Sequence, residues 1–150
     1  MSIEQSYNYR SITATLTTSG VVSAEQLQQL SAQHYQRVIN LLPNDSQYAT
    51  ADEQQLVEQQ HIDYVYIPVD FAAPRIDDYQ RFASAMQQSP SVKTHVHCAA
   101  NYRVSAFFGI YAYQYLDWSA TQVKQHIESL WQPSEHKPWL TLLQQEIEGF

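Results

Sequence analysis

Apolar positions divide this chain into short segments with the pattern of strands and longer segments with the pattern of helices. Residues 37–42 and 63–68 are rich in apolar and β-branched side chains, and residues 91–97 alternate in polarity. Both patterns predict strands that are buried on one or both faces. Residues 11–17 also alternate apolar with polar side chains, which predicts one further short strand.

Helical spacing of apolar residues fills the stretches between and after these strands. Ser23 and Thr50 each precede a Gln or Glu by three residues, the spacing of a capping box, so we expect a helix to begin after each. We expect further helices over residues 76–88, 103–115, 121–130 and 138–147. Strands that alternate with helices indicate an α/β sandwich. We therefore predict one domain over residues 1–150, with a largely parallel central sheet of four to five strands flanked by helices.

Composition excludes several classes of protein. The chain has 150 residues, is 44% hydrophobic and 15% charged, and carries a formal net charge of −7, which indicates a folded acidic protein. A non-specific nucleic-acid binder needs the opposite charge, so we expect no nucleic-acid partner. Apolar runs are too short to span a membrane, and no leader-like apolar segment begins the chain, so we expect a cytoplasmic protein with no membrane partner. A single cysteine rules out an intrachain disulfide and a four-cysteine zinc site.

That cysteine, Cys98, stands where a predicted strand meets a predicted helix. The helix dipole and the free backbone N–H groups of such a turn favour a thiolate, which is the nucleophilic form. The same N–H groups can hold an oxyanion, and Arg103 can clamp two of its oxygens with a planar fork. These parts together predict phosphoryl transfer through a cysteinyl-phosphate.

Two plainer interpretations concern the same residues. A lone cysteine is more often a small buried hydrophobic residue than a nucleophile. His95, His97 and Cys98 could also hold a metal ion, but no acidic ligand is evident beside them. We expect a packed, hydrogen-bonded histidine pair and no metal.

The segment from His97-Cys98 to Arg103 and Ser105 resembles the signature loop of the cysteine-dependent protein tyrosine and dual-specificity phosphatases. The resemblance is closer to a bacterial branch, the beta-lactamase-hydrolase-like phosphatases. It extends over most of the chain, through segments typical of that branch: Gly20, Ser23–Leu27, Val38–Leu41 and Ile67–Val69.

The resemblance implies a role for each site residue and implies that no cofactor is needed. Cys98 would be the nucleophile and Arg103 the phosphate clamp, while Ser105 would steady the thiolate and His97 would orient the loop. The general acid would be Asp70, which directly follows a predicted strand; Asp77 and Asp78 fit better as first-turn helix acids. The phosphate-binding loop would comprise Ala99, Ala100, Asn101, Tyr102 and Arg103. The substrate would be a phosphorylated small molecule or a phosphoprotein.

The loop departs from the common phosphatase pattern in two ways. Four residues separate Cys98 from Arg103, where the common loop has five, and the usual glycine is absent. Asn101 is the best substitute for that glycine because Asn tolerates a left-handed backbone. Rhodanese-type sulfurtransferases use a shorter cysteine loop of similar length, so sulfur transfer is one alternative. A non-catalytic phosphate-binding or regulatory module on the same fold is the other.

Overall fold

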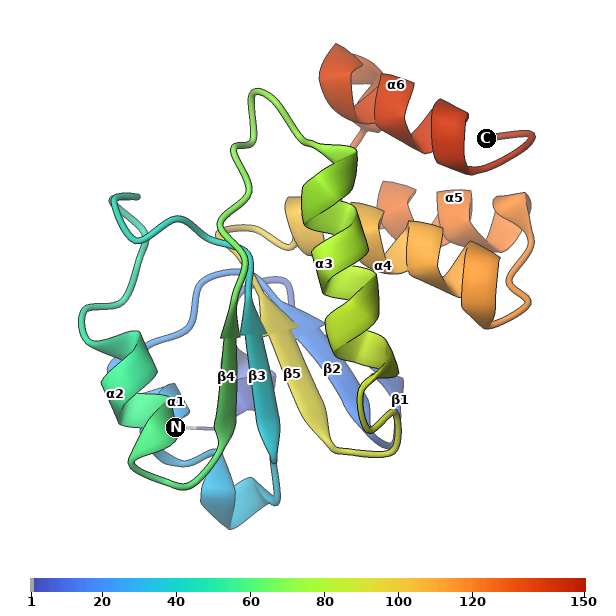
Figure 1. The fold of residues 1–150 in the computed structure, drawn as a ribbon. Helices are drawn as coiled ribbons and strands as arrows, with labels where there is room; N and C mark the ends of the chain where they lie inside the picture. The colour runs from blue at the N-terminus through green and yellow to red at the C-terminus, as the bar shows by residue number, and fades with distance from the viewer. Residues whose placement is uncertain (1) are drawn as a thin grey trace.

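A mixed five-stranded sheet forms the centre of the protein, whose computed structural model describes residues 2–150. Its strands are β1 (Arg10–Thr13), β2 (Leu16–Ser19), β3 (Arg37–Asn40), β4 (Asp63–Tyr66) and β5 (Thr94–His97), in the order β1-β2-β5-β3-β4 (Figure 1). Only β1 runs antiparallel to its neighbour, whereas the pairs β2–β5, β5–β3 and β3–β4 are all parallel. The predicted α/β fold with a largely parallel sheet is confirmed.

Helices cover both faces of the sheet. On one face lie α3 (Ile76–Gln87) and α4 (Tyr102–Tyr115), and α5 (Ala120–Glu128) and α6 (Lys137–Glu146) pack against α4 (Figure 1). The short helices α1 (Ala24–Gln28) and α2 (Glu53–Glu58) lie on the other face. Single 3-10 turns occupy Ile3–Gln5, Ser31–Gln33 and Pro133–Glu135. Among residues 2–150, no helix is both long and apolar enough to cross a lipid bilayer.

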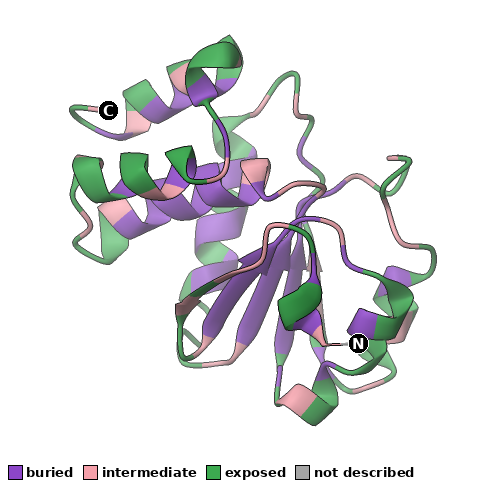
Figure 2. Ribbon diagram, turned by 180° about the vertical axis from the view of Figure 1, so that it is seen from behind, coloured by how far each residue is buried: buried purple, intermediate pink, exposed green. Residues whose placement is uncertain are grey.

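Alternation along β5 divides the interior into two parts. Val96 points toward α3 and α4 and joins the larger hydrophobic core, which includes Phe82 and Phe107. His95 and His97 point to the opposite face, toward α1 and α2, as the alternation predicted. The inner strands β2, β3 and β5 are buried at every residue (Figure 2), because both faces of the sheet are covered, whereas the edge strands β1 and β4 are half-buried or exposed.

One strand prediction and one capping-box prediction are wrong. Residues 11–17 were expected to form a single strand, but a turn at residues 14 and 15 divides them into the antiparallel pair β1 and β2. The amide of Thr15 donates to Thr13 Oγ1 (3.2 Å), so a threonine hydroxyl stabilises this turn, which contains neither glycine nor proline. The capping box at Thr50 does not form, because α2 begins after Asp52, whose side chain makes no cap hydrogen bond. The capping box at Ser23 is present.

Candidate active site

Cys98 lies at the carboxyl end of the central strand β5, and α4 begins four residues later. Its side chain is fully buried in the larger hydrophobic core, and its amide donates to Ser19 O on β2 (3.3 Å). The carboxyl ends of β3 and β4 meet at the same edge of the sheet, where ligands of parallel α/β proteins usually bind.

The carbonyl groups of the loop after Cys98 are held by neighbouring segments. Ala99 O accepts from the amide of Val21 (2.8 Å), and Ala100 O accepts from Asn8 Nδ2 (3.0 Å). Asn101 has the left-handed backbone expected of it (φ 67°), and its O accepts from the amide of Ser105 (3.0 Å). The loop is thus fastened through its carbonyl groups.

The backbone N–H groups of the same loop remain available. Within the described chain, none of the N–H groups of residues 99–104 has a hydrogen-bond partner. Consecutive free amides at a turn and at the first residues of a helix form an anion-binding cradle, and the dipole of the fourteen-residue α4 adds to it.

Gly20 lies directly behind this loop. A Cβ at Gly20 would come within 2.5 Å of Ala99 O and 2.8 Å of Ala100 Cα, both backbone atoms. The amide of Gly20 donates to Tyr7 O (2.7 Å), which fixes the segment from the other side. Only glycine allows β2 to approach the loop this closely.

Arg103 joins the loop to the segment that follows β4. Its Nε donates to Val69 O (2.9 Å), and its guanidinium carbon lies 5.3 Å from the centre of the Phe71 ring. Neither terminal nitrogen of this half-buried side chain has a hydrogen-bond partner among residues 2–150. The two nitrogens that form the planar fork are therefore free to hold an anion.

Asp70 sits between the two residues that Arg103 contacts. Its side chain is exposed, and its Oδ1 accepts from the amide of Ala72 (2.9 Å). The carbonyl group of Phe71 accepts from Trp139 Nε1 on α6 (2.8 Å), so the Asp70 segment is tied to both α4 and α6. The structure thus brings the Asp70 segment beside Arg103.

The other two candidate acids belong to α3. Asp77 and Asp78 both lie in its first turn, as expected. Asp77 pairs with Arg75 (3.4 Å) on the surface, and Asp78 pairs with Arg81.

A buried hydrogen bond between a histidine and a glutamate, which the sequence did not reveal, lies next to the cysteine loop. His97 Nε2 is 2.5 Å from Glu53 Oε2, and both side chains are at least 95% buried. His97 Nδ1 faces Cys98 O at 3.5 Å, so both ring nitrogens face oxygen acceptors. Glu53, expected to cap its own helix, instead connects α2 to the residue before Cys98. Thr50, its expected capping partner, donates its hydroxyl proton to Val22 O.

His95 is held in one neutral tautomer by the hydroxyl groups around it. The hydroxyl group of Ser19 donates to Gly20 O (2.9 Å), so its oxygen accepts from His95 Nε2 (2.8 Å). His95 Nδ1 then accepts from Thr17 Oγ1 (2.8 Å), which accepts from the hydroxyl group of Tyr35 (2.7 Å). Burial, with a smaller effect of the nearby His97, lowers the pKa of His95 well below its ordinary value. The expected hydrogen-bonded histidines are confirmed.

Ser105 and Tyr102 take part in contacts with the C-terminal segment. The Ser105 hydroxyl donates to Tyr102 O (3.0 Å) and accepts from Trp131 Nε1 (2.9 Å), so its one proton is engaged within α4. The Tyr102 ring stacks on Trp131, with centroids 4.8 Å apart. The role of Ser105 at the thiol stays a prediction.

Comparison with known proteins supplies the family. No family model matches the chain, and no curated protein matches it in sequence. Among solved structures, it is similar to a "Putative phosphatase (DUF442)" from Shewanella putrefaciens CN-32, with 33% identity over 95% of this chain and 90% of the other, at a TM-score of 0.84.

Two more distant structures share the fold. TpbA of P. aeruginosa, solved in complex with phosphotyrosine, is 12% identical over 91% of this chain and 82% of its own, with a TM-score of 0.72. The core catalytic domain of the PP-IP phosphatase SIW14 from S. cerevisiae is 11% identical over 96% and 88%, also with a TM-score of 0.72. The expected resemblance is confirmed: the chain belongs to the family described as "Putative phosphatase (DUF442)", and it shares the fold of the two more distant phosphatases.

Proposed function

We propose that this protein hydrolyses phosphate monoesters through a cysteinyl-phosphate on Cys98. The observation that carries the proposal is the run of free amides over residues 99–104, on a loop whose carbonyl groups are all engaged elsewhere. Such a run offers hydrogen bonds to an anion, and the backbone oxygens of the loop do not compete for them. The family of the chain agrees with this chemistry.

The first step transfers the phosphoryl group to sulfur. The Cys98 thiolate attacks phosphorus, an S–P bond forms, and the bond from phosphorus to the leaving oxygen breaks. The free amides and the two terminal nitrogens of Arg103 hold the phosphoryl oxygens. Asp70 donates a proton to the leaving oxygen.

The second step releases phosphate. Asp70, now ionised, accepts a proton from a water molecule that attacks phosphorus. The S–P bond breaks, inorganic phosphate leaves, and the thiolate is restored. His97 and Glu53 support the loop from below without touching substrate.

The test is the hydrolysis of an aryl phosphate by the wild type and by Cys98→Ser, with thiosulfate-to-cyanide sulfur transfer measured in parallel. The proposal expects phosphate release that Cys98→Ser abolishes while the fold stays intact. Sulfur transfer by the wild type would favour the rhodanese-like alternative instead. Phosphate binding without either activity would indicate a binding module.

Asp70→Asn tests the proton donor separately. We expect it to slow hydrolysis strongly for esters with poor leaving groups and less for esters with good ones, because only a poor leaving group needs the proton. Asp77→Asn, a change in a nearby acid already paired with Arg75, is the matched control and should alter neither rate. Equal losses for both kinds of ester in Asp70→Asn would remove Asp70 as the acid.

A further inference from the structure

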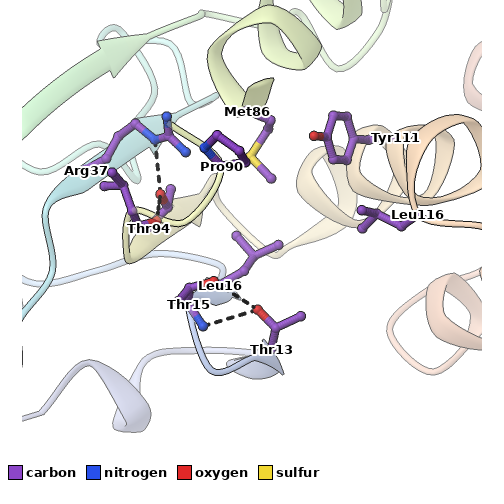
Figure 3. A pocket seen from close by; sticks show the side chains of 10 residues that line it. Thr13, Thr15, Leu16, Arg37, Met86, Pro90, Thr94, Tyr111 and Leu116 are labelled. Atoms are coloured by element: carbon purple, nitrogen blue, oxygen red, sulfur yellow. Dashed lines mark hydrogen bonds between the residues drawn. The ribbon is translucent and has the colours of Figure 1, made fainter. Parts of the chain in front are cut away.

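A cavity lies at the end of the sheet opposite to Cys98. Its volume is about 180 Å³, and it opens at the start of β5 and β3, where Thr94 pairs with both Arg37 and Leu16 (Figure 3). Its walls are mostly apolar, with Leu16, Met86 and Leu116 among them, and Arg37 is the one charged residue among residues 2–150 that lines it. No role in the proposed hydrolysis uses this cavity.

Arg37 is an arginine buried without a carboxylate partner. The residue is only 6% exposed, and within residues 2–150 it forms no ion pair shorter than 4 Å. Its Nε donates to Thr94 Oγ1 (3.0 Å), and its Nη1 donates to Ala85 O (2.8 Å) and to Gln88 O at the end of α3. These neutral acceptors fix the guanidinium against the last turn of α3, but they do not cancel its charge.

One nitrogen of this guanidinium is left over. Nη2 of Arg37 makes no hydrogen bond with any residue in the range 2–150. Asp63 on β4 attracts the guanidinium electrostatically, but the two groups are too far apart to form an ion pair. Burial lowers the pKa of Arg37, yet a guanidinium stays charged at neutral pH. Arg37 lines this cavity and also a neighbouring pocket that contains Asp63 and Glu58, so a fixed positive charge with an unused donor borders both.

Tyr111 supplies a second donor from the other side. In Figure 3 its hydroxyl lies on the side of the ring that faces Met86, with Pro90 and Arg37 beyond, and all four residues line the cavity. This hydroxyl has no hydrogen-bond partner within residues 2–150, and the charge of Arg37 acts on it. Burial raises the pKa of Tyr111, so the phenol keeps its proton at neutral pH and can donate.

We propose that this cavity binds a small monocarboxylate with an apolar body. Arg37 Nη2 and the Tyr111 hydroxyl would donate to the carboxylate, and the apolar walls would cover the rest of the molecule. Among residues 2–150, none that lines the cavity is acidic, and Asp63, which acts on Arg37, lines the neighbouring pocket instead. The volume lies below the roughly 300–1,000 Å³ of pockets for drug-sized molecules, which selects a ligand of about one ring or a short branched chain.

The site is independent of the proposed catalytic loop. Thr94 lies four residues before Cys98 along β5, a separation of about 13 Å at the rise of a parallel strand. A carboxylate in this cavity and a phosphate at the loop can therefore bind at the same time. The residues whose amide NMR signals shift will show which of the two sites is occupied.

The experiment is a titration of the full chain with benzoate, followed by amide NMR shifts. Benzyl alcohol, a neutral molecule of similar shape, is the ligand control. Tyr111→Phe removes the second donor with little change of volume, and Tyr113→Phe removes a hydroxyl of the same helix that does not line the cavity. Arg37→Gln is a further variant, but it also removes the hydrogen bond to Ala85 O and so weakens the end of α3. The proposal is therefore judged on Tyr111→Phe.

We expect saturable benzoate shifts centred on Thr94 and the residues around it, with no competition from inorganic phosphate. Tyr111→Phe should lower the affinity for benzoate about tenfold or more, which is the loss expected for a hydrogen bond to a charged group. Tyr113→Phe should leave that affinity unchanged. Equal affinity for benzyl alcohol, shifts confined to residues 98–104, or an unchanged affinity in Tyr111→Phe would each overturn the proposal.

Discussion

Replacing Gly20 by alanine tests how the cysteine loop is supported. The added Cβ would lie 2.5 Å from Ala99 O and 2.8 Å from Ala100 Cα. Both are backbone atoms of the loop, so no side chain can rotate away to relieve the contact. Either β2 or the loop must move.

The size of that movement follows from the contact distances. Ordinary contact begins at 3.4 Å, so the oxygen of Ala99 must retreat from 2.5 Å by about 0.9 Å. A misplacement of about 1 Å in reacting groups can cost roughly 10²-fold in rate. Overpacking of this kind also lowers the free energy of unfolding by about 1–3 kcal/mol. Gly20→Ala should therefore reduce kcat about 10²-fold and clearly lower the affinity for inorganic phosphate.

Gly109→Ala is the matched control. Its added Cβ would lie 2.7 Å from Val123 Cγ1, a side-chain atom at the contact between α4 and α5 and away from the loop. Because this side chain can shift and alanine favours a helix, we expect a smaller loss of stability in urea unfolding, with phosphate affinity and kcat close to those of the wild type.

Phosphate affinity by NMR, kcat with an aryl phosphate and urea unfolding would be measured for both variants. The reasoning is refuted if Gly20→Ala binds phosphate as the wild type does. It is equally refuted if Gly109→Ala loses as much phosphate affinity as Gly20→Ala.

Three further predictions concern other parts of the structure. Glu53→Ala should lower the free energy of unfolding in urea by about 1–3 kcal/mol, because it leaves a buried histidine nitrogen without its hydrogen-bond partner. Glu58→Ala on the same helix should change that free energy by under about 0.5 kcal/mol. Burial, with a smaller effect of a nearby arginine, lowers the pKa of His126 to about 4, so the unfolded chain takes up the proton first as the pH falls. Between pH 6.5 and 4 the wild type should lose up to about 3 kcal/mol more unfolding free energy than His126→Phe; parallel curves would contradict this. Trp139→Phe, which removes the hydrogen bond to Phe71 O, should lower kcat more for poor leaving groups than for good ones; a uniform loss would show that Trp139 does not position the acid segment.

Much of the fold and of the loop could be predicted from local sequence. The strand-loop-helix arrangement at Cys98 followed from hydrophobic periodicity, and the left-handed backbone of Asn101 followed from what that residue tolerates. The helix start at Ser23 carried its own capping signal. These features depend on residues near one another in the chain, so the pattern alone was enough.

The features that could not be predicted depend on contacts between distant segments. Glu53 had the spacing of a capping residue, and its pairing with His97, forty-four positions away, follows only from how α2 lies on the sheet. The link from Trp139 to Phe71 likewise depends on where α6 packs. Arg37 fell inside an apolar segment, and nothing in that segment indicated a charge held against the end of α3.

The central claim is the covalent intermediate, and rapid-quench mass spectrometry tests it most directly. Asp70→Asn would be mixed with a good aryl phosphate, quenched in acid and digested, because loss of the base should slow breakdown of the intermediate more than its formation. The account predicts one phosphoryl group on the peptide that contains Cys98, absent in Cys98→Ser. Release of the aryl alcohol with no phosphoryl group on that peptide, or with one on another residue, would contradict it.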